Sequence, residues 1–88
     1  MKWVCEVTES AEADLMDLPS FVRKRAARVI TEMEEDPFQG DVKPLKGKEW
    51  AGVFRRRLGD YRLLFSVDKP RRRVFIIRIL IRSEKSYR

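Results

Sequence analysis

Three segments in the second half of the chain alternate apolar and polar side chains, and no other feature restricts the possible folds as strongly. They span residues 52–58, 61–67 and 73–81. Alternation with a period of two is typical of strands with one buried face. Gly59-Asp60 allows only a tight turn between the first two segments, and residues 68–71 form a longer turn before the third. We therefore expect an antiparallel meander.

The first forty residues predict one strand followed by two helices. Residues 2–7 alternate like a strand that buries its odd-numbered side chains. Thr8 is a favourable N-cap for a short helix that runs to about Leu18. Ser20 is a plausible N-cap for a longer helix, which ends in the breakers of residues 36–40. The apolar stripe of this longer helix consists of Val22, Ala26, Val29, Ile30 and Met33.

The helices come as one block and do not alternate with the strands. The order β-α-α-β-β-β therefore predicts an α+β fold, with a helical hairpin packed on one face of a small, mainly antiparallel sheet. At 88 residues we expect a single domain, residues 1–88. The acidic run Glu34-Glu35-Asp36 opposes the dipole of the longer helix, so we expect it to be solvated or to face basic residues elsewhere.

Basic residues concentrate in the second half of the chain. The formal net charge is +6, but residues 1–40 carry 5 basic and 9 acidic side chains, whereas residues 41–88 carry 15 and 5. A positive surface of this kind suits a nucleic acid or an acidic protein partner. It is also compatible with a face that serves only to keep the protein soluble.

Several kinds of chemistry are excluded by what the chain lacks. It has no histidine and a single cysteine, Cys5, which argues against the usual metal sites, thiol catalysis and two-histidine ribonuclease chemistry. There is no glycine-rich phosphate loop. We therefore expect no metal and no cofactor. No apolar stretch is long enough to cross a membrane and the N-terminus lacks a secretory signal, so we expect a cytoplasmic protein.

Strand alternation sorts the basic side chains by sheet face. If the apolar sides pack under the helices, five arginines gather on the other face. They are Arg55, Arg57, Arg62, Arg78 and Arg82. In the last strand, the side expected to face the core consists of Phe75, Ile77, Ile79 and Ile81, with Val74, Ile76 and Leu80 on the arginine side. Guanidinium groups match phosphate oxygens, so such a face can hold a phosphodiester and stabilise negative charge that develops on it.

Arg56 does not fit this sorting, because its parity is that of the core residues. Three explanations stay open. Arg56 lies at a sheet edge, lies in a bulge, or has an acidic partner such as Glu34 or Glu35.

Three runs carry a resemblance to a known family. They are Pro44-Leu45-Lys46-Gly47, residues 54–65 with the element Gly59-Asp60-Tyr61-Arg62, and the closing stretch from Arg82 to Tyr87-Arg88. With the order of the elements, they resemble the RelE/ParE toxin superfamily over essentially the whole chain. Toxins of the RelE branch cleave messenger RNA in the ribosomal A site without metal, through attack of the ribose 2′-hydroxyl on the adjacent phosphate. The resemblance implies the same reaction here.

The resemblance also implies roles for individual residues. As catalytic residues, Arg62 and Arg82 would stabilise the pentavalent phosphorane, and Tyr87 would stack on a base or transfer a proton. The expected RNA-binding residues are Arg55, Arg57, Arg78 and Lys46. Arginine is too basic to accept a proton, so proton abstraction would fall to Tyr87 or to water.

The leading hypothesis is a toxin of a type II toxin-antitoxin system that acts as a ribosome-dependent endoribonuclease. Two alternatives stay open: a gyrase inhibitor of the ParE branch, and an inactive or purely RNA-binding module. The expected partners are the ribosome, messenger RNA and a cognate antitoxin, whose acidic or amphipathic segment would cover the basic face.

Overall fold

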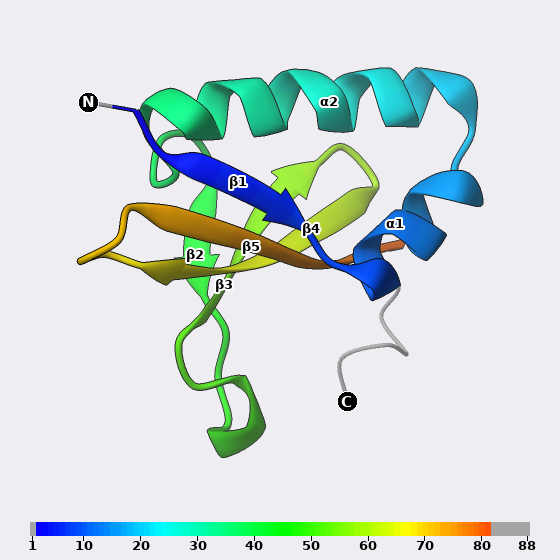
Figure 1. The fold of residues 1–88 in the computed structure, drawn as a ribbon. Helices are drawn as coiled ribbons and strands as arrows, with labels where there is room; N and C mark the ends of the chain where they lie inside the picture. The colour runs from blue at the N-terminus through cyan, green and yellow to red at the C-terminus, as the bar shows by residue number, and fades with distance from the viewer. Residues whose placement is uncertain (1, 82–88) are drawn as a thin grey trace.

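The structure, a computed structural model, describes residues 2–81 and forms one sheet with helices on one side (Figure 1). In chain order the elements are β1 (Val4–Val7), α1 (Glu9–Met16), α2 (Ser20–Glu35), β2 (Val42–Pro44), the short 3-10 helix η1 (Lys48–Trp50), β3 (Val53–Leu58), β4 (Tyr61–Asp68) and β5 (Arg73–Ile81). The sheet order is β1-β5-β4-β3-β2, with β1 parallel to β5 and the other pairs antiparallel. The expected α+β fold and meander are confirmed.

The hydrophobic core lies between α2 and the sheet. Val22, Ala26 and Met33 of α2 are buried and pack with Leu63 and Phe65 of β4, which are fully buried. The stripe predicted for this helix therefore faces the core. Among residues 2–81, neither helix is long and apolar enough to cross a membrane.

Strand β2 was not expected from the sequence. It has only three residues, ends in Pro44 and pairs with β3 alone, with Val42 opposite Arg56. A proline at the end of an edge strand leaves the ladder intact, because no neighbour needs its missing N–H. Three residues are too few to show a period, so the pattern could not reveal this strand.

The face prediction for β5 was wrong in its first half because the strand contains a bulge. Leu64 pairs with Arg78, but its neighbour Phe65 pairs with Ile76, so Ile77 is an extra residue that shifts the register. Beyond the bulge, Ile79 is buried under the helices as expected. Before it, Val74 and Ile76 are the fully buried core residues. Phe75, expected in the core, lies opposite Ser66 on the other face.

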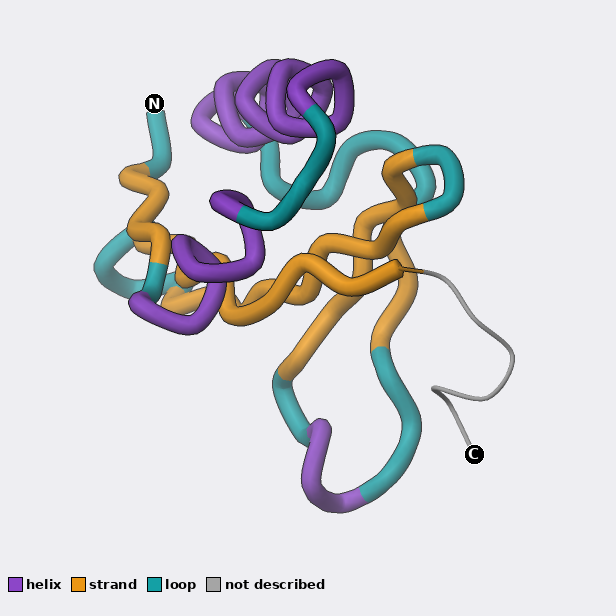
Figure 2. Tube along the Cα trace, turned by 90° about the vertical axis from the view of Figure 1, so that its right-hand side faces the viewer, coloured by secondary structure: helices purple, strands orange, loops and turns teal. Residues whose placement is uncertain are grey.

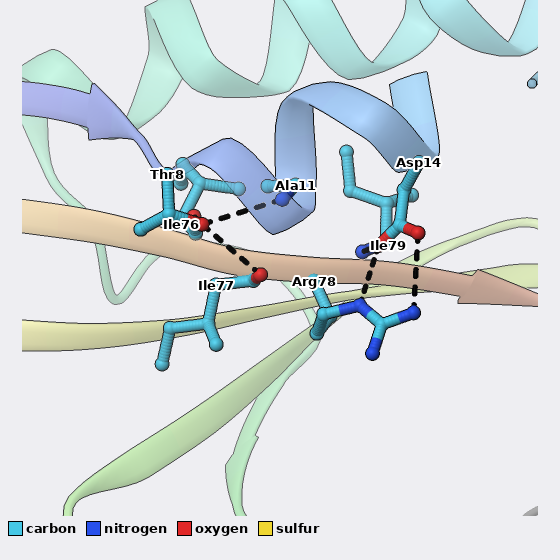
Figure 3. A network of polar contacts seen from close by, with 7 residues as sticks. All are labelled: Thr8, Ala11, Asp14, Ile76, Ile77, Arg78 and Ile79. Carbon is cyan, nitrogen blue, oxygen red and sulfur yellow. Dashed lines mark hydrogen bonds and ion pairs between the residues drawn. The ribbon is translucent and has the colours of Figure 1, made fainter. Parts of the chain in front are cut away.

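Helix α1 is anchored on β5 at this bulge (Figure 3). The Thr8 hydroxyl accepts a hydrogen bond from the Ala11 N–H and donates to the Ile76 carbonyl at 2.8 Å, with the Ile77 carbonyl at 3.2 Å. Thr8 is therefore the N-cap of α1, as predicted. Ser20 is not the N-cap of α2, because Pro19 occupies that position and Ser20 is the first helical residue.

Residues 45–52, between β2 and β3, form an arm that projects from the sheet, on the side away from α2 (Figure 2). Gly47 and Gly52 flank the 3-10 helix of this arm and have φ values of 104° and 79°. Side chains rarely adopt such angles, so glycine allows the arm to turn out of the sheet and back.

Candidate functional site

A groove of about 540 Å³ opens on the face of the sheet that the helices leave uncovered. One wall is the arm, and the floor is formed by residues of β3, of the first half of β4 and of the end of β5. The groove is lined by Lys43, Pro44, Leu45, Lys46, Glu49, Trp50, Arg55, Arg62, Leu64 and Leu80. The arm and the sheet are therefore both needed to build it.

The floor and the arm supply apolar surface. Leu64 is only 1% exposed, although it lies on the face opposite the core and is no part of the core cluster. Leu80 lies beside it on β5, and the half-buried Trp50 comes from the arm. An indole beside basic side chains is a surface on which a nucleobase can stack.

Among the residues that the structure describes, four cations line the groove against one carboxylate. Lys43, Lys46, Arg55 and Arg62 supply the positive charge, and Glu49 the negative one. Arg55 is 17% exposed, and Asp41 lies 3.6 Å from its guanidinium, which orients the side chain. A groove with excess positive charge and partly buried guanidinium groups can bind a phosphodiester and stabilise a dianionic phosphorane.

The structure brings three of the predicted site residues into this groove. Arg55, Arg62 and Lys46 come from β3, β4 and the arm. Arg57 lies on the same sheet face, opposite Arg62 in the ladder, but not in the groove lining. It is exposed, and its Nε donates to the Gly59 carbonyl at 3.4 Å.

Arg78 is not brought into the groove. Its guanidinium donates two hydrogen bonds to the Asp14 carboxylate of α1, at 2.8 and 3.2 Å (Figure 3). Asp14 also accepts the Ile79 N–H at 2.9 Å. Arg78 therefore joins α1 to β5. Arg82 and Tyr87, the other two residues expected in catalysis, lie outside the described residues.

Arg56 has an acidic partner, one of the three explanations left open by the sequence. The partner is Glu32, at 2.8 Å, and not Glu34 or Glu35. The guanidinium also donates to the Gln39 carbonyl at 3.1 Å. Part of the acidic end of α2 thus faces basic residues elsewhere, since Glu35 also lies 3.5 Å from Lys2.

Sequence reasoning missed Lys43, Trp50 and the apolar floor of the groove. Lys43 was missed because β2 was not recognised. Leu80 was placed on the arginine side of the sheet, but the sequence did not show that Leu64 and Leu80 form the floor of a groove. Trp50 had a visible signal: it is a large aromatic residue in a segment bounded by Gly47 and Gly52 and rich in lysine.

Within residues 2–81, two acidic groups have displaced pKa values, and neither lies in the groove. Burial raises the pKa of Asp14, but the hydrogen bonds from Arg78 and Ile79 outweigh it, so this pKa lies below its usual value. The same contact raises the pKa of Arg78. Burial and the nearby Glu34 raise the pKa of the Cys5 thiol to about 11. Its S–H points to the Ile30 carbonyl at 3.8 Å, so Cys5 is a packing residue.

Comparison with known proteins gives one family and several solved structures. The family model described as "ParE toxin of type II toxin-antitoxin system, parDE" matches residues 5–86. A search of curated protein sequences finds no relative.

The solved structures that are similar include complexes and a free toxin. The chain in the RelBE2 toxin-antitoxin complex of Mycobacterium tuberculosis is 28% identical, with a TM-score of 0.82 over 93% of this chain and 100% of that chain. The chain in the archaeal RelE-RelB complex of Pyrococcus horikoshii is 26% identical, with a TM-score of 0.80 over 96% of this chain and 99% of that chain. The isolated RelE toxin of E. coli is 26% identical, with a TM-score of 0.74 over 96% of this chain and 90% of that chain.

Proposed function

The chain belongs to the RelE/ParE superfamily of toxins of type II toxin-antitoxin systems, and on this premise we propose that it is a metal-independent, ribosome-dependent endoribonuclease that cuts messenger RNA and stops translation. The observation that carries the proposal is the groove, where four cations and an indole surround an apolar floor. That combination suits single-stranded RNA, whose phosphates need cations and whose unstacked bases need an aromatic surface.

Arginine, rather than a metal, would supply the electrostatic part of the catalysis. The 2′-hydroxyl loses its proton and attacks the neighbouring phosphate, which places a second negative charge on the phosphorane. The P–O5′ bond then breaks, so that a 2′,3′-cyclic phosphate forms and the 5′-oxygen leaves and takes up a proton. Arg62, on the floor of the groove, would stabilise the charge on the phosphorane, with Arg82 as a second donor. Arg55 and Lys46 would hold the backbone on either side, and Arg57 would extend the contact beyond the groove.

Two further groups would complete the site. Trp50 would stack on a base and so fix the position of the scissile linkage. Tyr87 would move the proton, because an arginine side chain is too basic a group to accept one.

A cognate antitoxin is the proposed protein partner. The similar solved structures include toxin-antitoxin complexes from a bacterium and an archaeon. A groove with this charge suits an acidic or amphipathic segment laid across it. Such a complex should weaken as salt is raised, because the contacts between exposed charges are screened.

The test is cell-free translation of a defined message, followed by primer extension. We expect cuts only in translated message, and a loss of about 10²- to 10³-fold in cleavage rate for Arg62→Ala, the size seen when one preorganised donor is removed. Arg71→Ala is the matched control, because this arginine is highly exposed in the β4–β5 turn, where it pairs with Asp68. It should cut at the wild-type rate.

A gyrase inhibitor is the second candidate, favoured by the match to the ParE family model. Supercoiled plasmid, gyrase and ATP are incubated with the protein, and trapped breaks appear as linear DNA after denaturation. Linear DNA together with uncut message would replace the nuclease by gyrase poisoning. If neither linear DNA nor cut message appears, the protein would be an RNA-binding module without catalytic activity.

A further inference from the structure

A second basic surface lies on α2, outside the groove. Phe21, Lys24, Arg25 and Arg28 follow each other at helical spacing and share one exposed face. We call these four residues the α2 stripe. Phe21 is 68% exposed, which is unusual for so large an apolar side chain. Arg23, the other arginine of this helix turn, is used internally, since it donates to the Leu18 carbonyl at 2.9 Å.

The charges of the α2 stripe are not explained by the stability of the helix. The cations of the stripe gain no support from the helix dipole, because none of them lies in the last turn of α2. Lys24 and Arg28 are four residues apart and repel each other. Within residues 2–81, no ion pair joins the three cations to a carboxylate; Glu32, one turn after Arg28, is taken by Arg56.

The α2 stripe is linked to the groove face through the turn between β3 and β4, which lies beneath α2 (Figure 1). A Cβ atom added to Gly59 would lie 2.6 Å from Nη1 of Arg25, so the guanidinium of this arginine reaches the turn. Arg57 reaches the same glycine from the other side and donates to its carbonyl. Positive charge therefore continues from the groove face around the turn to α2.

We propose that the α2 stripe is a second RNA-binding surface, which holds the backbone of a folded RNA while the message lies in the groove. The inference deepens the proposed function and rests on it. Its three cations match phosphates, and folded RNA is recognised mostly through its backbone and shape, so binding should depend on RNA shape more than on sequence. Phe21 would stack on an unpaired base where a duplex ends.

The binding test uses an RNA hairpin with a stem of about 16 base pairs, without ribosomes, and all proteins carry Arg62→Ala to lower any residual cleavage. The variant K24Q/R25Q/R28Q is compared with K2Q/K69Q/R71Q, which removes the same charge from exposed positions elsewhere. We expect the stripe variant to bind about 10- to 100-fold more weakly, and the slope of log affinity against log salt to fall by about 2 to 3, near 0.9 for each lost phosphate contact. The control should change less than about threefold.

A loss of folding is not expected to cause the weaker RNA binding of the stripe variant. Removing the repulsion between Lys24 and Arg28 should leave the melting temperature of the stripe variant unchanged or raised. An equal loss of affinity in both variants would mean that only net charge matters, and the inference would be wrong. Intact RNA binding with loss of antitoxin binding would assign the surface to the protein partner and also overturn it.

Phe21→Ala sharpens the test without changing charge. We expect about tenfold weaker binding of the hairpin, whose loop bases are unpaired, and no change for a blunt duplex of the same stem. If the affinity falls for both RNAs, or for neither, Phe21 does not stack on an unpaired base and is no part of the RNA-binding surface.

The translation assay separates this inference from the proposed function. If the wild-type protein cuts message while the stripe variant binds RNA normally, the inference fails alone. If the wild-type protein cuts nothing but the stripe variant loses RNA affinity, the nuclease proposal fails and the RNA-binding surface stands.

Discussion

The two faces of the sheet use the same side chain for different purposes, and three consecutive arginines of β3 show this. Arg56 points to the helix side, where Glu32 at 2.8 Å and the Gln39 carbonyl neutralise and bind it. Arg55 and Arg57 point to the open side, where Arg55 lines the groove and Arg57 lies at the turn. Alternation along one strand therefore separates an arginine that holds the fold together from those available to a ligand.

The leucines of β4 show the same contrast. Leu63 and Leu64 are both essentially buried. Leu63 lies in the core between α2 and the sheet, whereas Leu64 forms the floor of a groove that opens to solvent. Burial alone does not tell a core residue from a site residue; the face of the sheet does.

Replacing each leucine by alanine should give the largest difference between the faces. Leu63→Ala should lower the free energy of unfolding by about 3–5 kcal/mol, because a closed cavity remains in the core. Leu64→Ala should cost about 1–2 kcal/mol, since water can enter the space left at the floor of the groove. Urea unfolding measures both. Equal costs would show that the floor is as closed as the core.

The paired variants Arg55→Gln and Arg56→Gln test the separation of structure from function. Arg56→Gln should lower stability by about 1–2 kcal/mol, because Glu32 loses its partner, and leave cleavage unchanged at temperatures where the protein is folded. Arg55→Gln should lower cleavage about 10- to 100-fold with little effect on stability, since its ion pair with Asp41 is longer and Asp41 is exposed. Translation assays and thermal melts on the same samples measure both. Lower stability in Arg55→Gln together with slower cleavage in Arg56→Gln would contradict the assignment of the two faces.

A smaller effect is expected where α1 holds Arg78 away from the groove. The pKa of Asp14 is lower in the folded protein than in the unfolded chain, so its contribution to stability is present above the unfolded pKa of about 4 and is lost as the pH falls through the folded pKa. Asp14→Asn should cost about 1 kcal/mol at pH 7 and less than that near pH 2. Urea unfolding at the two pH values measures the difference. A cost independent of pH would show that the carboxylate charge is not involved.

The sequence allowed the local elements and the faces of β3 and β4 to be predicted, because both depend on short-range periodicity. This periodicity also predicted that Arg55 and Arg62 lie on the same face of the sheet. The bulge at Ile77 could not be predicted, since nothing in β5 marks an extra residue until its partner strand is in place. The Asp14–Arg78 contact joins residues 64 positions apart and depends on how α1 docks. The groove itself needs the arm, whose path depends on β2 and on two glycines.

The extra residue in β5 has a consequence for how this chain can change over time. Because the register shifts at Ile77, the first half of the strand gives Val74 and Ile76 to the interior, and the second half gives Leu80 to the groove. Loss or gain of a single codon here would turn one half of the strand inside out. A lineage can exchange side chains in β5 one at a time, but it cannot alter the length of the strand without giving up either its interior or its groove.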